Sequence, residues 1–174
     1  GWSSGLLITE LGKVYSALKR GTSAELEEPA SFQAYAAVVQ EDSPAVQSAL
    51  HYWRREFRDL PPLLEFPADR PRPSVRPARA ATRKRRLDPS LQQALKRLAA
   101  SRRTTLVTLL LTGLKTLLYR LTGTSDLAVG LGSAGQVMLE KPCLVGHCVQ
   151  VLPIRTQLET DKSFLDNLAN VKKK

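Results

Sequence analysis

The chain has 174 residues, of which 43% are hydrophobic and 24% charged, a composition that is typical of folded proteins and excludes wholesale disorder. Its net charge is +10, and its two cysteines, Cys143 and Cys148, are too few for a disulfide scaffold, so we expect free thiols in a cytoplasmic protein. The most apolar stretch, residues 106–121, is too short and too interrupted to cross a bilayer. We therefore expect no membrane partner and predict a buried core helix there.

The first part of the chain is predicted to form three helices. Residues 4–20 repeat apolar side chains at helical spacing, and Gly21 follows as a stop signal. A polar loop leads to a short helix over residues 32–40. Ser43 is the expected N-cap of a third helix, which starts with proline, runs to about residue 58 and carries one apolar face.

A segment rich in proline and arginine, residues 61–87, interrupts this helical pattern. We predict an irregular connector with a short edge strand over residues 63–66. A nucleic-acid interface would need stacking aromatic side chains among the cations, and this segment has none there. We favour a solvated connector and expect no nucleic acid as a partner. The cations are Arg70, Arg72, Arg76, Arg79, Arg83, Lys84, Arg85 and Arg86.

The second half of the chain mixes helical and strand patterns. Asp88 caps a helix over residues 89–101, and a second helix follows and ends at Gly123. This mixture predicts an α/β (α+β) fold. The remaining elements are two strands, within residues 126–135 and 147–158, and a helix that begins near residue 163.

Three potential metal ligands lie close together in the sequence, at Cys143, His147 and Cys148. A structural zinc site needs four ligands, usually as two spaced pairs. Neighbouring residues of an extended chain also point to opposite faces, which separates His147 from Cys148. We therefore expect no metal site.

The first five residues, GWSSG, fit the letters of the Gly-x-Ser-x-Gly nucleophile elbow. Asp126 and His147 follow in the chain order that a hydrolase triad would need. The competing interpretation is a turn of small residues that caps the first helix, and we prefer it. No catalytic residue is assigned within this chain.

Four stretches, taken together and in order, resemble the condensation domains of nonribosomal peptide synthetases. Residues 1–3 (GWS) are similar to the end of the signature HHxxxDGWS. Residues 51–73 resemble the family's Tyr-Trp helix and its proline-arginine run, and residues 108–130 its long helix that leads into a strand. Residues 144–155 (LVGHCVQVLPIR) correspond to the motif usually written IGFFVNTLPLR.

The resemblance implies an architecture and a position within it. The expected fold is a partial two-lobed sandwich like that of chloramphenicol acetyltransferase, with helices packed on open sheets. Residues 1–60 would end the N-terminal lobe, residues 61–87 would connect the lobes, and residues 88–174 would begin the C-terminal lobe. We expect an internal fragment whose HHxxxD histidines precede Gly1, with no catalytic activity by itself and with exposed helix faces prone to aggregation.

The resemblance also implies a function, namely amide-bond formation between an acyl or peptidyl thioester and an aminoacyl acceptor. Both substrates would be carried on the phosphopantetheine of carrier-protein domains, so the expected partners are donor and acceptor carriers and neighbouring synthetase modules, and no cofactor is bound directly. The alternative is a non-catalytic condensation-like module that docks acidic carrier proteins.

Five residues receive roles from this resemblance. Gly1, Trp2 and Ser3 would lie beside the active site, and His147 and Gln150 would line the substrate tunnel. Gln150 stands where the family usually has asparagine, and it keeps the amide but reaches further. His147 stands where phenylalanine is common, and we interpret it as an ordinary strand residue rather than a substitute base.

Overall fold

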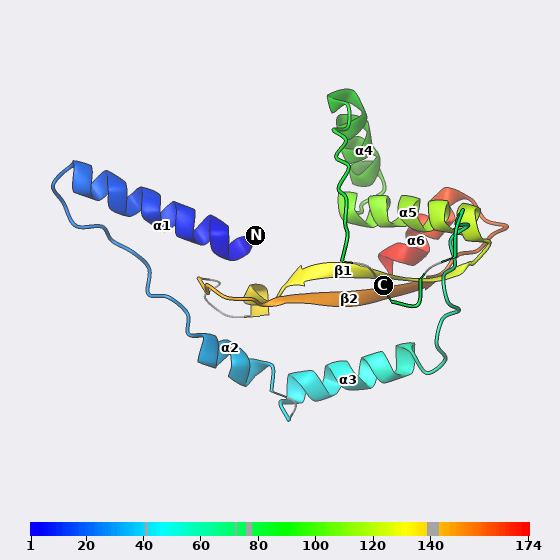
Figure 1. Cartoon of the computed structure of the whole chain (residues 1–174), viewed down its shortest axis with the longest axis horizontal. Helices are drawn as coiled ribbons and strands as arrows, with labels where there is room; N and C mark the ends of the chain where they lie inside the picture. Colours follow the sequence, from blue (N-terminus) through cyan, green and yellow to red (C-terminus); the bar gives the residue numbers. More distant parts are fainter. Residues whose placement is uncertain (41, 72, 76–77, 139–142) are drawn as a thin grey trace. The chain divides into compact units, whose positions relative to one another are not determined.

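The computed structural model describes residues 1–40, 42–71, 73–75, 78–138 and 143–174, apart from the side chains of residues 137 and 138. Arg72, Arg76 and Pro77, which belong to the predicted connector, lie outside the described residues. The mixture of helices and strands in Figure 1 confirms the α/β (α+β) class. In chain order the elements are α1 (Trp2–Lys19), α2 (Phe32–Val38), α3 (Pro44–Glu56), α4 (Pro89–Ser101), α5 (Leu106–Thr122), β1 (Asp126–Ala134), the 3-10 turn η1 (Gly135–Met138), β2 (Val149–Gln157) and α6 (Phe164–Lys172).

The helices begin and end at the local signals of the sequence. The side chain of Ser43 accepts a hydrogen bond from the backbone N–H of Val46, and the carboxylate of Asp88 accepts one from the N–H of Ser90. Gly123 ends α5 in the left-handed conformation, with φ of 72°, which a residue without Cβ adopts at little cost. These helix boundaries therefore follow from short-range chemistry.

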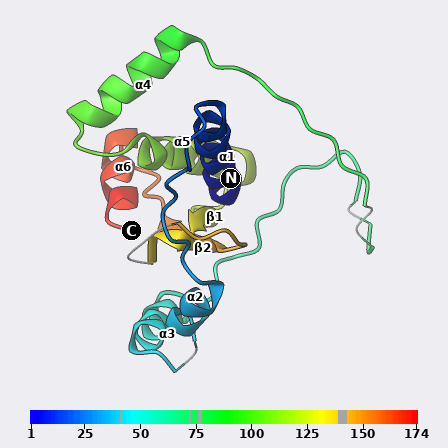
Figure 2. The same cartoon turned by 90° about the vertical axis from the view of Figure 1, so that its left-hand side faces the viewer.

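The predicted edge strand over residues 63–66 does not form, and the described residues between α3 and α4 contain no helix or strand (Figure 2). Leu63 is 82% exposed. Prolines at positions 61, 62 and 67 remove backbone donors around these residues, and a strand needs a hydrogen-bonded neighbour. The prediction of a strand was wrong, because in the described structure the backbone of these residues pairs with no other strand.

Helix α5 is buried on one face only, which corrects the expectation of a buried core helix. Leu109, Thr112 and Lys115 are buried. A second row of apolar side chains along the same helix is exposed, each to between 43% and 53%. This row consists of Val107, Leu110, Leu114, Leu117 and Leu121.

The two strands pair side by side as an antiparallel ribbon (Figure 1). The N–H of Leu158 donates to the carbonyl of Ser125 at one end, and the N–H of Gly135 donates to the carbonyl of Cys148 at the other. Because residue numbers fall along one strand as they rise along the other, the strands run in opposite directions. The side chains of β1 alternate between less and more exposed positions from Leu127 onward, so one face of the ribbon is covered.

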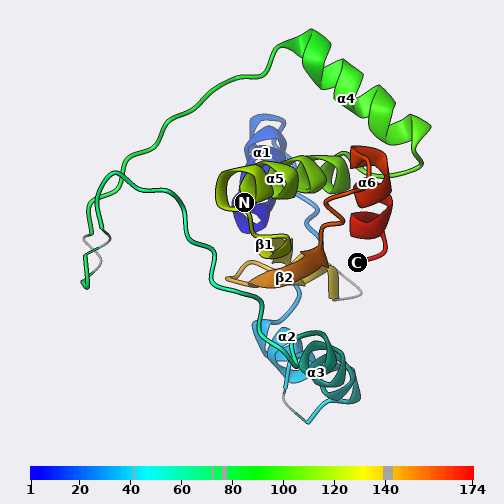
Figure 3. The same cartoon turned by 90° about the vertical axis from the view of Figure 1, so that its right-hand side faces the viewer.

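The contacts of the chain divide it into two compact units, residues 1–59 with 130–153 and residues 60–129 with 154–174. The first unit holds a small core of Tyr35, Leu144 and Cys148. In the second unit α5 packs against α4 and α6, which lies beside it in Figures 2 and 3. The core there consists of Ala99, Leu109 and Leu168, with Leu95 and Leu98 packed against it. The division into lobes at residues 60 and 87 stays a prediction.

Among the described helices, none combines the length and the hydropathy that a bilayer crossing requires.

Candidate functional site

Ser3, near the start of α1, is bound on both sides to the backbone of Gly146. Its hydroxyl donates to the Gly146 carbonyl at 3.0 Å and accepts from the Gly146 N–H at 3.1 Å. These partners are 143 residues apart in the chain. The contact therefore brings the GWS residues next to the segment that leads into β2, so two of the four stretches singled out in the sequence meet in space.

Gln136, in η1, completes the hydrogen bonding around this backbone. Its side-chain amide donates to the Gly146 carbonyl at 3.4 Å, and its side chain is only 1% exposed. The carbonyl oxygen of that side chain has no hydrogen-bond partner in the described structure. Gly146 itself lies close to the ring of Phe32, where an added Cβ would come within 2.7 Å of a ring carbon. A side chain at position 146 would therefore displace the ring of Phe32.

His147 and Cys148, which follow Gly146, differ sharply in exposure. Cys148 is 2% exposed and packs with Tyr35 and Leu144, whereas His147 is exposed. This difference agrees with the expectation that the two side chains point to opposite faces. No hydrogen bond or ion pair of the His147 side chain is present in the described part of the structure, so nothing orients the imidazole as a base.

Gln150, in β2, is exposed, and its amide donates to the hydroxyl of Tyr35 at 3.4 Å. Tyr35 comes from α2 and is buried. The backbone of Gly135 lies against the Cys148 carbonyl and the Tyr35 hydroxyl, so closely that a Cβ added to Gly135 would overlap both. Tyr35 is a residue of this site that sequence reasoning missed.

An open hollow of about 430 Å³ lies beside the start of α1. Backbone and apolar groups dominate its lining, with one carboxylate and one buried thiol. Trp2 contributes its indole ring and is 43% exposed. The lining residues are Gly1, Trp2, Gly5, Leu6, Glu27 and Cys143.

The two cysteines are free and buried, and they serve local structure. The thiol of Cys143 donates to the carbonyl of Glu28 at 3.2 Å, and the Cys143 carbonyl accepts from the N–H of Ala30. Within the residues that the structure describes, no group of three His, Cys, Asp or Glu side chains could hold a metal ion.

The hydrolase-type arrangement considered from the sequence does not form. Ser3 lies within α1 rather than on a turn before it, and its hydroxyl is bound to Gly146. The carboxylate of Asp126 is held by Arg155 through two hydrogen bonds, at 3.0 and 2.6 Å. The preferred interpretation also needs correction in one respect, because Gly1 is the N-cap and no side chain caps α1.

Lys115 is a second residue that sequence reasoning missed, and it lies in the unit formed by residues 60–129 and 154–174. It is fully buried, and its ammonium donates to the carbonyl of Leu127 at 3.1 Å, the carbonyl of Ile154 at 2.7 Å and the hydroxyl of Thr156 at 2.8 Å. All three of its N–H donors are therefore satisfied. The sequence did contain an indication of this burial. Lys115 follows Leu109 and Thr112 at intervals of three residues, so all three lie on the same face of the helix.

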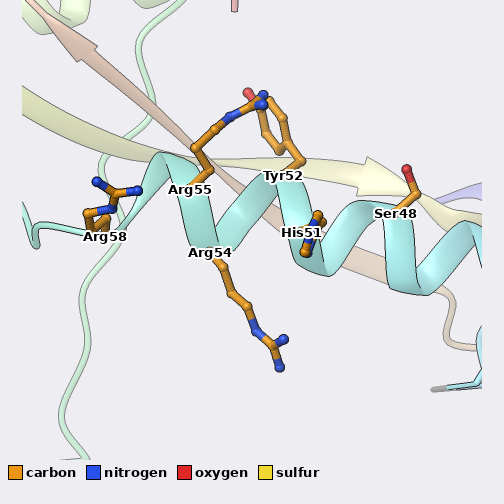
Figure 4. A pocket seen from close by; sticks show the side chains of 6 residues that line it. All are labelled: Ser48, His51, Tyr52, Arg54, Arg55 and Arg58. Atoms are coloured by element: carbon orange, nitrogen blue, oxygen red, sulfur yellow. The ribbon is translucent and has the colours of Figure 1, made fainter.

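A larger surface hollow, of about 720 Å³, runs along α3, but its side chains do not converge. Figure 4 shows Arg55 beside the ring of Tyr52, whose centre is 6.0 Å from the guanidinium carbon, while Arg54 points the other way. Every lining residue comes from α3 or its end, so no second element closes the space. The hollow is an exposed basic helix surface and not a candidate active site.

Comparisons with known proteins agree with the motifs. A family model described as "Condensation domain" matches residues 1–174. A linear gramicidin synthase protein of Brevibacillus parabrevis is 35% identical over 99% of the chain, and phosphinothricin tripeptide synthetase PhsC of Streptomyces viridochromogenes is 34% identical over 99%. The chain spans 2% and 16% of these two proteins, respectively.

Solved structures give the same result for the fold. The first condensation domain of the calcium-dependent antibiotic synthetase, in complex with a substrate analogue, matches 99% of the chain with a TM-score of 0.82 and 22% identity. The chain covers 40% of that structure. Together with the related structures, this match confirms the expected chloramphenicol-acetyltransferase-like fold.

Proposed function

Because the chain belongs to the condensation-domain family of nonribosomal peptide synthetases, we propose that it contributes to amide-bond formation between two carrier-bound substrates. The amine of an aminoacyl acceptor attacks the carbonyl carbon of an acyl or peptidyl thioester. The thiol of the donor arm leaves, and the amine loses one proton. The substrates are carried on phosphopantetheine arms of two carrier-protein domains, and we place the reaction in the cytoplasm.

The observation that carries this proposal is the double hydrogen bond between Ser3 and Gly146. It joins the two segments that the resemblance assigns to the active-site edge and the tunnel wall. Sequence similarity alone places these segments in one family, but it does not require them to touch. Their contact supports the view that residues 1–3 and 146–150 act as one site.

The residues of this site divide into positioning and contact roles. Ser3 and Gln136 hold the Gly146 backbone, and they act through it rather than on substrate. Gln150 offers an exposed amide that can donate to and accept from a substrate amide. His147 serves as a wall residue and not as the base that removes the amine proton. No catalytic group is assigned to residues 1–174.

The test is a condensation assay with a condensation domain that contains residues 1–174, loaded donor and acceptor carriers, and mass spectrometry of the product. We expect an amide product, a loss of about tenfold in rate for Gln150→Ala, and a smaller loss for Gln150→Asn, which retains the amide. His147→Phe should retain activity, and residues 1–174 alone should give no turnover.

Each variant has an outcome that would contradict its assigned role. Loss of activity in His147→Phe, with folding unchanged, would make His147 a participant in proton transfer. Equal rates for wild type and Gln150→Ala would remove Gln150 from the tunnel. The absence of amide from a folded domain with both carriers loaded would overturn the proposed function itself.

A further inference from the structure

The positive charge of this protein is concentrated in one part of the chain. Residues 70–125 contain 14 of the 26 lysines and arginines but only one of the 16 acidic residues, Asp88. This stretch therefore carries a charge of +13, whereas the rest of the chain is at −3. The net charge of +10 is thus a property of one segment and not of the whole surface.

Between residues 79 and 103 the cations are exposed and lack acidic partners. In the described part of the chain, none of the nine cations between residues 79 and 103 forms an ion pair, and every one of them is exposed. The single carboxylate nearby, that of Asp88, caps α4, and its hydrogen bonds with Ser90 hold its pKa below the usual value. The nine are Arg79, Arg83, Lys84, Arg85, Arg86, Lys96, Arg97, Arg102 and Arg103.

Two features of the segment favour an acidic protein over a nucleic acid as its partner. Single-stranded nucleic acid is bound by aromatic side chains that stack on bases, and no aromatic residue occurs from position 67 to position 118. Duplex readers place a recognition helix in a groove, whereas only two of the nine cations, Lys96 and Arg97, lie in a helix. An acidic protein surface requires neither stacking nor a groove, only charges that it can approach.

We propose that residues 79–103, here called the basic segment, are a docking surface for an acidic carrier-protein domain. This inference rests on the proposed function for the choice of carrier domain, but the attraction itself requires only a negative protein surface. Opposite charge raises the rate of encounter and orients the two domains before the substrate arm enters. The expected interaction is therefore fast, weak and sensitive to salt.

The experiment measures the affinity of the full chain for an apo carrier domain of net negative charge, without its phosphopantetheine arm. Three proteins are compared. They are wild type, the variant Arg83→Gln/Lys84→Gln/Arg85→Gln in the basic segment, and the control Arg54→Gln/Arg55→Gln/Arg58→Gln, whose positions are exposed on α3 and just after its end. The two triple variants remove the same charge, and the positions in the basic segment are exposed, so their loss should leave folding intact.

We expect the basic-segment variant to weaken binding about tenfold at low salt, and the control variant to change it less than about twofold. Wild-type binding should also weaken about tenfold when salt is raised from 50 to 300 mM, because salt shortens the Debye length and screens the attraction between the two proteins. Equal losses in the two triple variants would overturn the proposal, since they would show a response to net charge alone. Tighter binding of a duplex DNA probe than of the carrier domain would overturn it as well.

The design separates this inference from the proposed function. Binding of the apo carrier that depends on the basic segment, without amide formation in the condensation assay, would support the docking surface while the proposed function fails. Amide formation by a basic-segment variant with an unchanged KM for both carriers would retain the proposed function and overturn the docking surface.

Discussion

At the scale of single residues, Lys115 shows how a charge is accommodated inside this fold. Its ammonium ends among two backbone carbonyls and one hydroxyl, with no carboxylate among its hydrogen-bond partners. Burial, helped by the positive charge of Lys174 and opposed by the negative charge of Asp126, lowers the pKa of Lys115 to about 8. The hydrogen bonds join α5 to both strands, so the residue connects the layers of its unit at the cost of burying a cation.

Because Lys115 is buried with a lowered pKa, we expect the free energy of unfolding to rise with pH. Between pH 8 and about 10.4 the unfolded chain retains a proton on this amine that the folded chain has lost, so the free energy of unfolding increases with pH in that window. Relative to Lys115→Met, wild type should gain roughly 1 to 2 kcal/mol between pH 7 and pH 9.5.

Urea unfolding of both proteins at several pH values measures this gain. Lys96→Met removes one exposed positive charge and serves as the control, with no comparable change expected. A difference between wild type and Lys115→Met that stays constant from pH 7 to pH 9.5 would contradict the assignment.

At the scale of elements, α4 ends in an unusual way for its sequence. Arg103 adopts φ of 49°, in the left-handed region where glycine is favoured. The following N–H, of Thr104, donates to the carbonyl of Ala99, and the N–H of Arg103 donates to that of Ala100. These two bonds form the Schellman pattern that normally carries glycine at this position. The helix end is therefore well bonded but is formed by a residue with a Cβ.

Replacement of Arg103 by glycine should stabilise the protein. A left-handed residue with a Cβ is disfavoured, so Arg103→Gly is expected to raise the free energy of unfolding by about 0.5 to 1 kcal/mol. Arg97→Gly, in the interior of the same helix, should lower it by about 1 kcal/mol. Thermal unfolding of the two variants shows the opposite shifts, and a lower midpoint for Arg103→Gly would contradict the argument.

At the scale of the whole molecule, apolar surface is exposed on several helices. In α1 five large apolar side chains are more than half exposed. The exposed row of α5 contains five apolar side chains that are about half exposed. Only Ala17 is buried in α1. Exposed apolar surface on either helix favours association of the chain with itself. The α1 residues are Leu7, Ile8, Leu11, Tyr15 and Leu18.

Polar substitutions on the exposed row of α5 should reduce self-association of residues 1–174 without unfolding the chain. Leu110→Gln/Leu117→Gln removes apolar surface that contributes little to the core, because both side chains are about half exposed. Sedimentation at increasing protein concentration should show less association than wild type. Leu109→Gln, on the buried face, should instead lower stability by more than about 2 kcal/mol. Unchanged association of the double variant would exclude this surface as the cause.

Much of the local structure could be predicted from the sequence because its causes are local. Ser43 and Asp88 cap their helices, Gly123 ends α5, and the two strands form within the predicted stretches. Each of these features depends on residues within a few positions of one another, so a single chain carries the required information. The family also followed from the sequence, because four motifs occur in the family's order and the model of that family matches them.

The tertiary structure decided which residues meet and which faces are covered. The contacts of Ser3 with Gly146, of Gln150 with Tyr35 and of Lys115 with Ile154 join positions 143, 115 and 39 residues apart. The pattern of α5 predicted apolar positions but could not say which row finds a partner, and the strand expected over residues 63–66 lacked one. Pairing and burial depend on groups that are distant in the chain, and their free energies exist only once the backbone has brought those groups together.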